Sequence, residues 1–181
     1  MNLKNGQIMS FKQEMELLKK QYNINKYSYL NDDNYDHYMG TLAVFKTPTT
    51  ARQVEKAIVA FMQYKGHQCG AVDTQGSVRE GESYKVAGGV IKGKTVRLPT
   101  AGTVGAADLS ATMYGIAVHI EVKFSKGDRQ SKKQKEFEAK VLSAGGIYFV
   151  TKGVDHFREQ YYELLEYPQI KLMKDYADNN S

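Results

Sequence analysis

The chain has 181 residues and a mass of 20.4 kDa, and 41% of the residues are hydrophobic, which is enough for the core of one domain. Its 25 basic and 20 acidic residues leave a mild charge of +5, and its single cysteine, Cys69, excludes an internal disulfide and a cysteine-based zinc site. No apolar run approaches the length of a membrane span, and the first residues lack the apolar segment of a signal peptide. We therefore expect a soluble cytoplasmic protein with no membrane partner.

The N-terminal part is predicted to contain two helices separated by a polar segment. Residues 8–21 place apolar side chains at helical spacing, whereas residues 22–38 are rich in Asn, Asp and Tyr and are expected to form an arm or loop. Residues 50–65 begin with Thr and Pro cap signals, end before Gly66 and repeat apolar residues at three- and four-residue steps, which predicts a helix. Short β-prone runs between residues 66 and 105 predict strands and hairpins.

The second half of the chain alternates predicted strands and helices. Residues 115–123 (GIAVHIEVK) alternate cleanly and predict a strand, and Ser131 is expected to cap a helix that ends at Gly145. Residues 147–153 predict a buried strand, followed by a last helix that Pro168 ends. This order predicts an α/β fold class with a mixed central β-sheet flanked by helices. We expect three segments. Residues 1–47 form an N-terminal helix with a Tyr/Asn-rich arm, residues 48–153 form the core, and residues 154–181 form a C-terminal helix with a tail.

Residues 88–95 (GGVIKGKT) match the phosphate-binding loop pattern G-x-x-x-x-G-K-[ST]. That loop requires a buried strand before it and a helix after it, because the helix N-terminus and its backbone N–H groups hold the phosphates. Here the preceding run is polar, and the following run contains β-branched residues and Pro99. We therefore expect a β-hairpin at this place and keep P-loop nucleotide binding as a remote alternative.

Two carboxylates and a lysine are expected to meet on the predicted strands. The alternation puts Glu121 and Lys123 on one face, roughly 7 Å apart along the strand. A turn at residues 113–115 would fold the run that contains Asp108 against this strand and bring the two carboxylates together. Because neighbouring carboxylates repel, a divalent cation between them suits them best, with the lysine stabilising developing negative charge. The pattern predicts a metal site for phosphodiester hydrolysis, and the alternative is a solvated sheet face with an ordinary Glu/Lys pattern.

The segments GAADLS, HIEVK and RQSKKQKEFEAKVLSAGGIYFV resemble the core of the PD-(D/E)XK nucleases, most closely the VRR-NUC branch found in phage proteins and repair nucleases. The resemblance covers residues 50–153. It implies a restriction-endonuclease-like core and a deoxyribonuclease that needs Mg²⁺ or Mn²⁺, in the cytoplasm of a bacterial or phage-infected cell. The chain departs from the family at Ala107, where proline is common, but that proline shapes the chain and supplies no ligand.

The resemblance also implies roles for individual residues. Asp108 and Glu121 would hold the metal together with the backbone carbonyl of Val122. Lys123 would assist the attacking water. Gln134 takes the place of a glutamine that opens the following helix in the family, and it completes the implied catalytic set.

A glutamate on the first helix of the family core completes the metal ligands, and Glu55 takes its place here. Its predicted helix face is the packed one, where an unpaired carboxylate is costly, although a pair with Arg52 is the alternative. For Gln134 the alternative is an ordinary polar residue at a helix start. His119 shares the predicted face of Glu121, and we expect it to be packed or solvent-facing.

Basic residues gather directly after the predicted Glu121 strand, at Lys126, Arg129, Lys132, Lys133 and Lys135. Positive charges at a helix start are opposed by the helix dipole, so helix stability does not account for them. Phosphates of a DNA substrate would account for them, with recognition of backbone and shape, whereas a solvated polar face is the alternative. Stand-alone members of the resembled group are small homodimers, some acting on branched DNA such as Holliday junctions. The rival from another class is a non-catalytic nucleic-acid-binding module with a nuclease-like fold.

Overall fold

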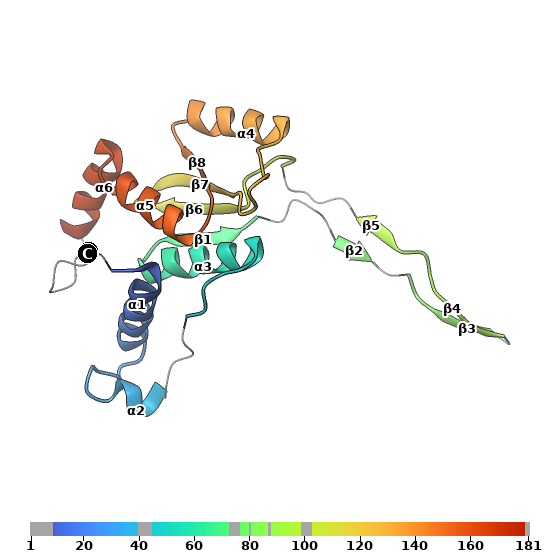
Figure 1. The fold of residues 1–181 in the computed structure, drawn as a ribbon, viewed down its shortest axis with the longest axis horizontal. Coiled ribbons are helices and arrows are strands. Elements are labelled where there is room, and N and C mark those ends of the chain that lie inside the picture. Colours follow the sequence, from blue (N-terminus) through green and yellow to red (C-terminus); the bar gives the residue numbers. More distant parts are fainter. Residues whose placement is uncertain are drawn as a thin grey trace.

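The computed structural model describes residues 9–39, 45–72, 77–79, 81–86, 88–98 and 103–179. Within these ranges the chain forms a mixed α/β body and a two-stranded β-ribbon that extends away from it (Figure 1). The body contains a four-stranded mixed sheet flanked by helices, which confirms the predicted fold class at this level. In the described part of the chain, no helix is both long and apolar enough to cross a membrane.

The body contains the strands β1 (Gln68–Ala71), β6 (Leu109–Met113), β7 (Ile116–Val122) and β8 (Ile147–Thr151). They lie side by side in this order. β1 pairs with β6 and β6 with β7 in antiparallel fashion, whereas β7 and β8 are parallel. A two-residue turn joins β6 to β7, and both of its residues, Tyr114 and Gly115, have positive φ angles of 48° and 83°. This backbone is typical of the tight hairpin turns that suit the twist of a sheet. The turn therefore lies where the sequence predicts it.

Helices cover both faces of this sheet. Those on one face are α1 (Phe11–Lys26), α3 (Ala51–Tyr64) and α5 (Val154–Leu165), and α4 (Lys132–Ser143) lies on the other. The alternation of β8 shows the two sides, because Phe149 stacks on Phe157 of α5 while Tyr148 packs with Val141 of α4. Val118, Ile120 and Val122 of β7 are buried in the larger core. The side chains between them on β7 therefore face α4.

Two sequence predictions about the ends of the chain are wrong. The expected arm at residues 22–38 contains the end of α1 and a short helix, α2 (Tyr35–Met39). In the extended part of α1, Tyr22 packs on Tyr64 of α3, with ring centroids 5.2 Å apart. The helix α5 ends at Leu165, before Pro168 as predicted, but it is not the last one: Pro168 begins a further helix, α6 (Pro168–Asn179), because the first position of a helix needs no N–H donor. Ile170, which is fully buried, anchors α6 on the body.

The β-ribbon consists of two short antiparallel ladders. In one, β2 (Ser77–Arg79) pairs with β5 (Val96–Leu98), and in the other, β3 (Tyr84–Val86) pairs with β4 (Gly89–Ile91). The P-loop-like residues 88–95 lie in this β-ribbon, and β5 follows them at the place where a phosphate-binding loop requires a helix. The hairpin prediction is therefore confirmed, and the fold removes the support for a P-loop.

Candidate active site

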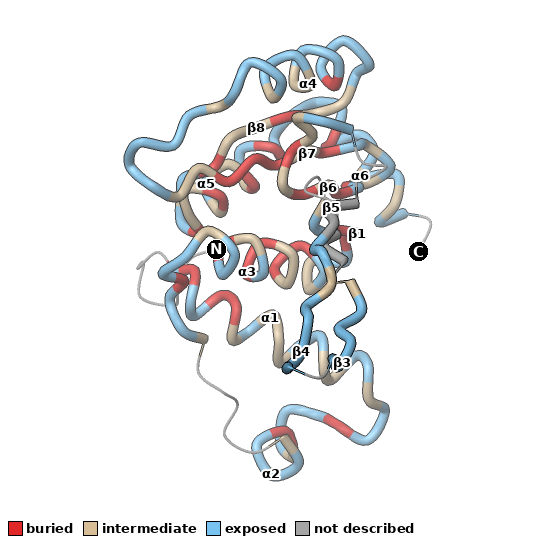
Figure 2. Tube along the Cα trace, turned by 90° about the vertical axis from the view of Figure 1, so that its right-hand side faces the viewer, coloured by how far each residue is buried: buried red, intermediate tan, exposed pale blue. Residues whose placement is uncertain are grey.

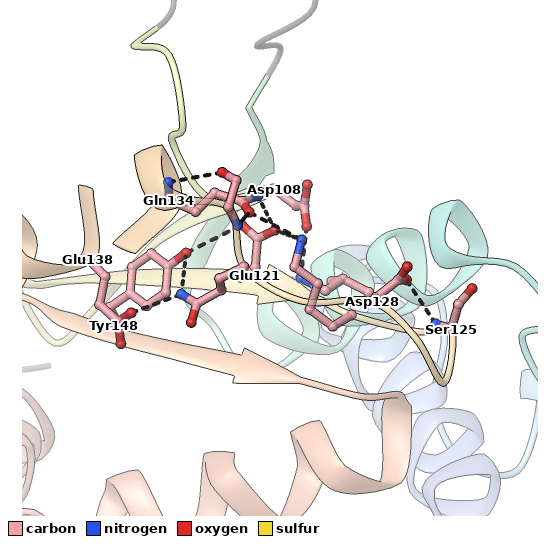
Figure 3. A network of polar contacts seen from close by, with 11 residues as sticks. Asp108, Glu121, Ser125, Asp128, Gln134, Glu138 and Tyr148 are labelled. Atoms are coloured by element: carbon pink, nitrogen blue, oxygen red, sulfur yellow. Dashed lines mark hydrogen bonds and ion pairs between the residues drawn. The ribbon is translucent and has the colours of Figure 1, made fainter. Parts of the chain in front are cut away.

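Glu121 on β7 lies in the interior of the body, and none of its side chain is exposed. Three side chains contact its carboxylate (Figure 3). Lys123 Nζ lies 2.6 Å from Oε1, Gln134 Nε2 donates to the same oxygen, and the Tyr148 hydroxyl donates to Oε2 at 3.3 Å. The alternative of a solvated sheet face is therefore wrong for Glu121, because α4 covers this side of the sheet.

The charge around Glu121 does not fully compensate its burial. Burial is the largest influence and raises the pKa of Glu121, the hydrogen bond from Lys123 lowers it, and the negative charge of Asp108 raises it further. The net result is a pKa above the ordinary value of 4.5. An additional positive charge at this carboxylate would therefore stabilise its ionised form.

Asp108 is held beside β7 by the hairpin and by one hydrogen bond. Asp108 directly precedes β6, and its neighbour Leu109 pairs with Ile120 of β7. The Oδ2 atom of Asp108 accepts a hydrogen bond from the Val122 N–H at 2.8 Å. This places Asp108 next to Glu121, as the alternation and the turn predict.

Gly105 allows the Asp108 segment to approach the first turn of α4. Its φ is +83°, and a Cβ at this position would lie 2.6 Å from the carbonyl carbon of Lys133. A side chain is therefore excluded both by the backbone conformation and by contact with another backbone. Glycine here joins the two segments that carry Asp108 and Gln134.

Gln134 belongs to the helix cap and to the site at once. Its backbone N–H donates to Ser131 Oγ at 3.2 Å, and its Oε1 accepts from the Ser131 N–H at 2.8 Å, which completes a capping box. Its Nε2 donates to Glu121, and Lys123 Nζ donates to its Oε1 at 3.4 Å. The two interpretations of Gln134, a helix-start residue and a site residue, therefore both hold for its position.

Glu55 on α3 is half-buried on the Asp108 side of the site. Burial and then the negative charge of Asp108 raise its pKa, while the charge of Arg52 lowers it. Among the residues that the structure describes, no three His, Cys, Asp or Glu side chains converge to hold a metal ion. Glu55 is close enough to Asp108 for the two charges to interact, and its role as a metal ligand stays a prediction.

Sequence reasoning missed Tyr148 on β8 and the contacts behind it. Gln130 Nε2 donates to Glu138 Oε2 at 2.9 Å and to the Tyr148 hydroxyl at 3.5 Å, which links the loop before α4 to the site. Burial, the largest influence, raises the pKa of Tyr148 well above its ordinary range, so its hydroxyl stays protonated and can donate to Glu121. The parallel register of β7 and β8 gives Tyr148 this place, and no local pattern signals that register.

The other predicted residues lie around the start of α4. All five basic residues are exposed, in the loop before α4 and in its first turn, which contains Gln134; they are Lys126, Arg129, Lys132, Lys133 and Lys135. His119 packs edge-on against Phe137, with ring centroids 5.2 Å apart, and burial lowers its pKa. Of the two expectations for His119, packed or solvent-facing, the structure shows the packed one.

The arrangement brings two carboxylates and an ammonium group together, at Asp108, Glu121 and Lys123, and the resemblance adds the backbone carbonyl of Val122. Carboxylate and carbonyl oxygens are the ligands of Mg²⁺ and Mn²⁺ in proteins. The residues present therefore fit a divalent ion in the chemistry of their donors. No family model, no curated protein and no solved structure matches this chain.

Proposed function

We propose that the protein is a metal-dependent nuclease that hydrolyses DNA phosphodiester bonds, built on a restriction-endonuclease-like core of the VRR-NUC type. The observation that carries the proposal is Glu121, a fully buried carboxylate whose pKa is raised by burial despite its contact with Lys123. A buried charge with incomplete compensation is costly to the fold, and such groups concentrate at functional sites. The motif resemblance supplies the reaction, and the buried network supplies its physical support.

Asp108, Glu121 and the Val122 carbonyl would hold Mg²⁺ or Mn²⁺. Bound there, the ion would supply positive charge to the phosphate and acidify an attacking water. Lys123 remains beside the carboxylate, where its ammonium group can donate to the phosphate or orient the water. Gln134 positions Glu121 through its hydrogen bond and is itself held by the helix cap.

The exposed basic residues at the start of α4 would bind the phosphates that flank the cleaved bond. They border the loop and first turn that also position Gln134, so bound DNA would lie next to Glu121. The resemblance extends the proposal to a homodimer that acts on branched DNA, including Holliday junctions. One observation favours the non-catalytic binding module as a second candidate, namely that no third carboxylate joins Asp108 and Glu121 within the described ranges.

Cleavage assays on linear, single-stranded and branched DNA with Mg²⁺ or Mn²⁺ test the proposal. We expect Glu121→Gln and Lys123→Ala each to lower the cleavage rate at least about 100-fold, because each removes a charge from the reacting centre. DNA binding in EDTA should survive in both variants. Glu136→Gln, which neutralises an exposed carboxylate of the same helix α4, is the matched control and should cleave normally. If the wild-type protein cuts none of these substrates with either ion, the binding module replaces the nuclease.

A further inference from the structure

The β-ribbon has no role in the site described above, and its construction needs an explanation. It projects from the body (Figure 1), and the described residues of β3 and β4 at its far end are exposed (Figure 2). A two-stranded hairpin with nothing packed on it is marginally stable in water. The exposed end of the β-ribbon would therefore gain stability from a partner that covers it.

The two faces of the ribbon end differ in chemistry. Tyr84 pairs with Ile91 and shares its face with Val86, and these side chains are 58%, 48% and 46% exposed. The opposite face carries the exposed pair of Lys85 and Val90. Just beyond the end of β4 follow two further exposed lysines, Lys92 and Lys94. The ribbon end thus combines an apolar face with three exposed lysines on or next to its strands.

A close backbone contact between two glycines connects the two ladders. A Cβ on Gly93 would lie 2.4 Å from the carbonyl carbon of Gly81, and a Cβ on Gly81 would lie 2.9 Å from the Lys94 carbonyl oxygen. Side chains at these positions would force the strands apart. The glycines keep the two strands side by side between the ladders, so that the projection is one continuous element.

Charge and reach match a DNA duplex. Residues 77–98 contain five basic residues (Arg79, Lys85, Lys92, Lys94, Arg97) and two acidic ones (Glu80, Glu82), a balance of 5 − 2 = +3 out of the chain's +5. The β-ribbon has about 11 residues per strand, which span roughly 36 Å at about 3.3 Å per residue, close to one helical turn of DNA. A two-stranded ribbon also fits the width of the major groove.

We propose that the β-ribbon lies in the major groove of a duplex next to the cleavage site. Its apolar face contacts base edges and thymine methyl groups on the groove floor, while the exposed Lys85, Lys92 and Lys94 reach the phosphates of the groove walls. The inference rests on the proposed function and specifies its substrate class, namely DNA that carries at least about one turn of duplex beside the cut. The alternative occupant of the apolar face is a second copy of the chain, which the second experiment below distinguishes.

The first test measures duplex binding in EDTA, where cleavage plays no part. The variant Lys85→Ala/Lys92→Ala/Lys94→Ala is compared with Lys12→Ala/Lys26→Ala/Lys171→Ala, which removes three exposed lysines from α1 and α6. For a 30-base-pair duplex we expect the ribbon variant to bind at least about tenfold more weakly, with a salt dependence reduced by about 3 in the log–log slope. The control variant should stay within about twofold of wild type in affinity, with its slope unchanged. Wild-type affinity and slope in the ribbon variant would overturn the proposal.

The second test concerns the apolar face. Tyr84→Ser/Ile91→Ser should weaken duplex binding without changing the salt slope, and it should leave the melting temperature and the sedimentation coefficient of the free protein unchanged. A change from dimer to monomer in this variant would assign the apolar face to a second copy of the chain and overturn the DNA proposal. The two proposals fail separately. An inactive wild-type protein whose duplex binding still depends on the lysines contradicts only the nuclease, whereas an active protein with a dispensable β-ribbon contradicts only this inference.

Discussion

Among the residues that the structure describes, two glutamates are completely buried, Glu14 on α1 and Glu121 on β7, and their surroundings act in opposite directions. Glu14 contacts two cations and a phenol: Lys65 Nζ lies 2.9 Å from Oε1, and Arg158 and the Tyr162 hydroxyl also donate to the carboxylate. Burial alone would raise the pKa of Glu14, but the hydrogen bonds from Tyr162, Lys65 and Arg158 outweigh it, and the pKa is lowered. At Glu121 the balance is reversed, and the pKa is raised.

The difference separates a structural carboxylate from a functional one. Glu14 joins α1 to α3 and α5, and its charge is matched by more than one cation, so that no further positive charge is needed. Glu121 has one ammonium contact, from Lys123, and a second carboxylate, Asp108, nearby. The two glutamates are equally buried, but the negative charge is fully compensated at Glu14 and only partly at Glu121. Of the two sites, the one at Glu121 can therefore accept another cation.

The largest expected effect comes from Glu14→Gln. The substitution leaves Lys65 and Arg158 largely buried without their partner, and we expect a loss of about 3–5 kcal/mol in the free energy of unfolding. Denaturant unfolding measures this loss, with Glu163→Gln on the exposed side of α5 as the control. Cleavage per folded molecule should be unchanged, because the site lies on the other face of the sheet. An unaltered free energy of unfolding would mean that the network does not hold α1.

Gly105→Ala should have the next largest effect, and it acts on the Glu121 region through its scaffold. A side chain at φ +83° and 2.6 Å from the Lys133 backbone combines conformational strain with a collision, for an expected loss of about 2–4 kcal/mol. Cleavage should fall further than the unfolded fraction explains, because Asp108 and Gln134 separate. Gly127→Ala is the matched control, since a Cβ there would meet nothing within 4 Å. Equal behaviour of the two variants in unfolding and cleavage would refute this role of Gly105.

The parts of the site that the sequence predicts are those set by local rules. The alternation of residues 115–123 and the turn after Met113 bring Asp108 to Glu121, and the capping signal at Ser131 places Gln134 at a helix start. Each of these depends on neighbours within about a dozen residues in sequence.

The parts that the sequence does not predict depend on packing between distant segments. Tyr148 reaches Glu121 through the parallel register of β8, 27 residues away, and Arg158 reaches Glu14 across 144 residues. No periodicity encodes such pairs. The same holds for α6, because Pro168 can either end or begin a helix, and burial of Ile170 decides the outcome. The site is therefore predictable where it lies on one hairpin and one helix cap, and unpredictable where the fold closes around it.

The smallest expected effect, and the sharpest test of the comparison, is the stability of Glu121→Gln. The folded pKa of Glu121 lies above its ordinary value of 4.5, so the folded protein keeps this proton longer than the unfolded chain, and wild-type stability falls as the pH rises through the folded pKa. A neutral glutamine avoids that loss. Lys123, which is 16% exposed, still reaches solvent and Gln134. At pH 8 we expect Glu121→Gln to be as stable as wild type or about 1 kcal/mol more stable, with the difference shrinking toward pH 5.

Glu14 must show the opposite sign, because its lowered pKa provides stability that is present above about pH 4.5 and is lost as the pH falls through the folded pKa. Denaturant titrations of wild type, Glu14→Gln and Glu121→Gln at pH 8 and pH 5 therefore separate the two carboxylates. Mg²⁺ adds a second readout, since it should raise the melting temperature of the wild-type protein and of Glu14→Gln but not of Glu121→Gln. A loss of several kcal/mol in Glu121→Gln at pH 8 would make Glu121 a second structural carboxylate, whose charge needs no added cation.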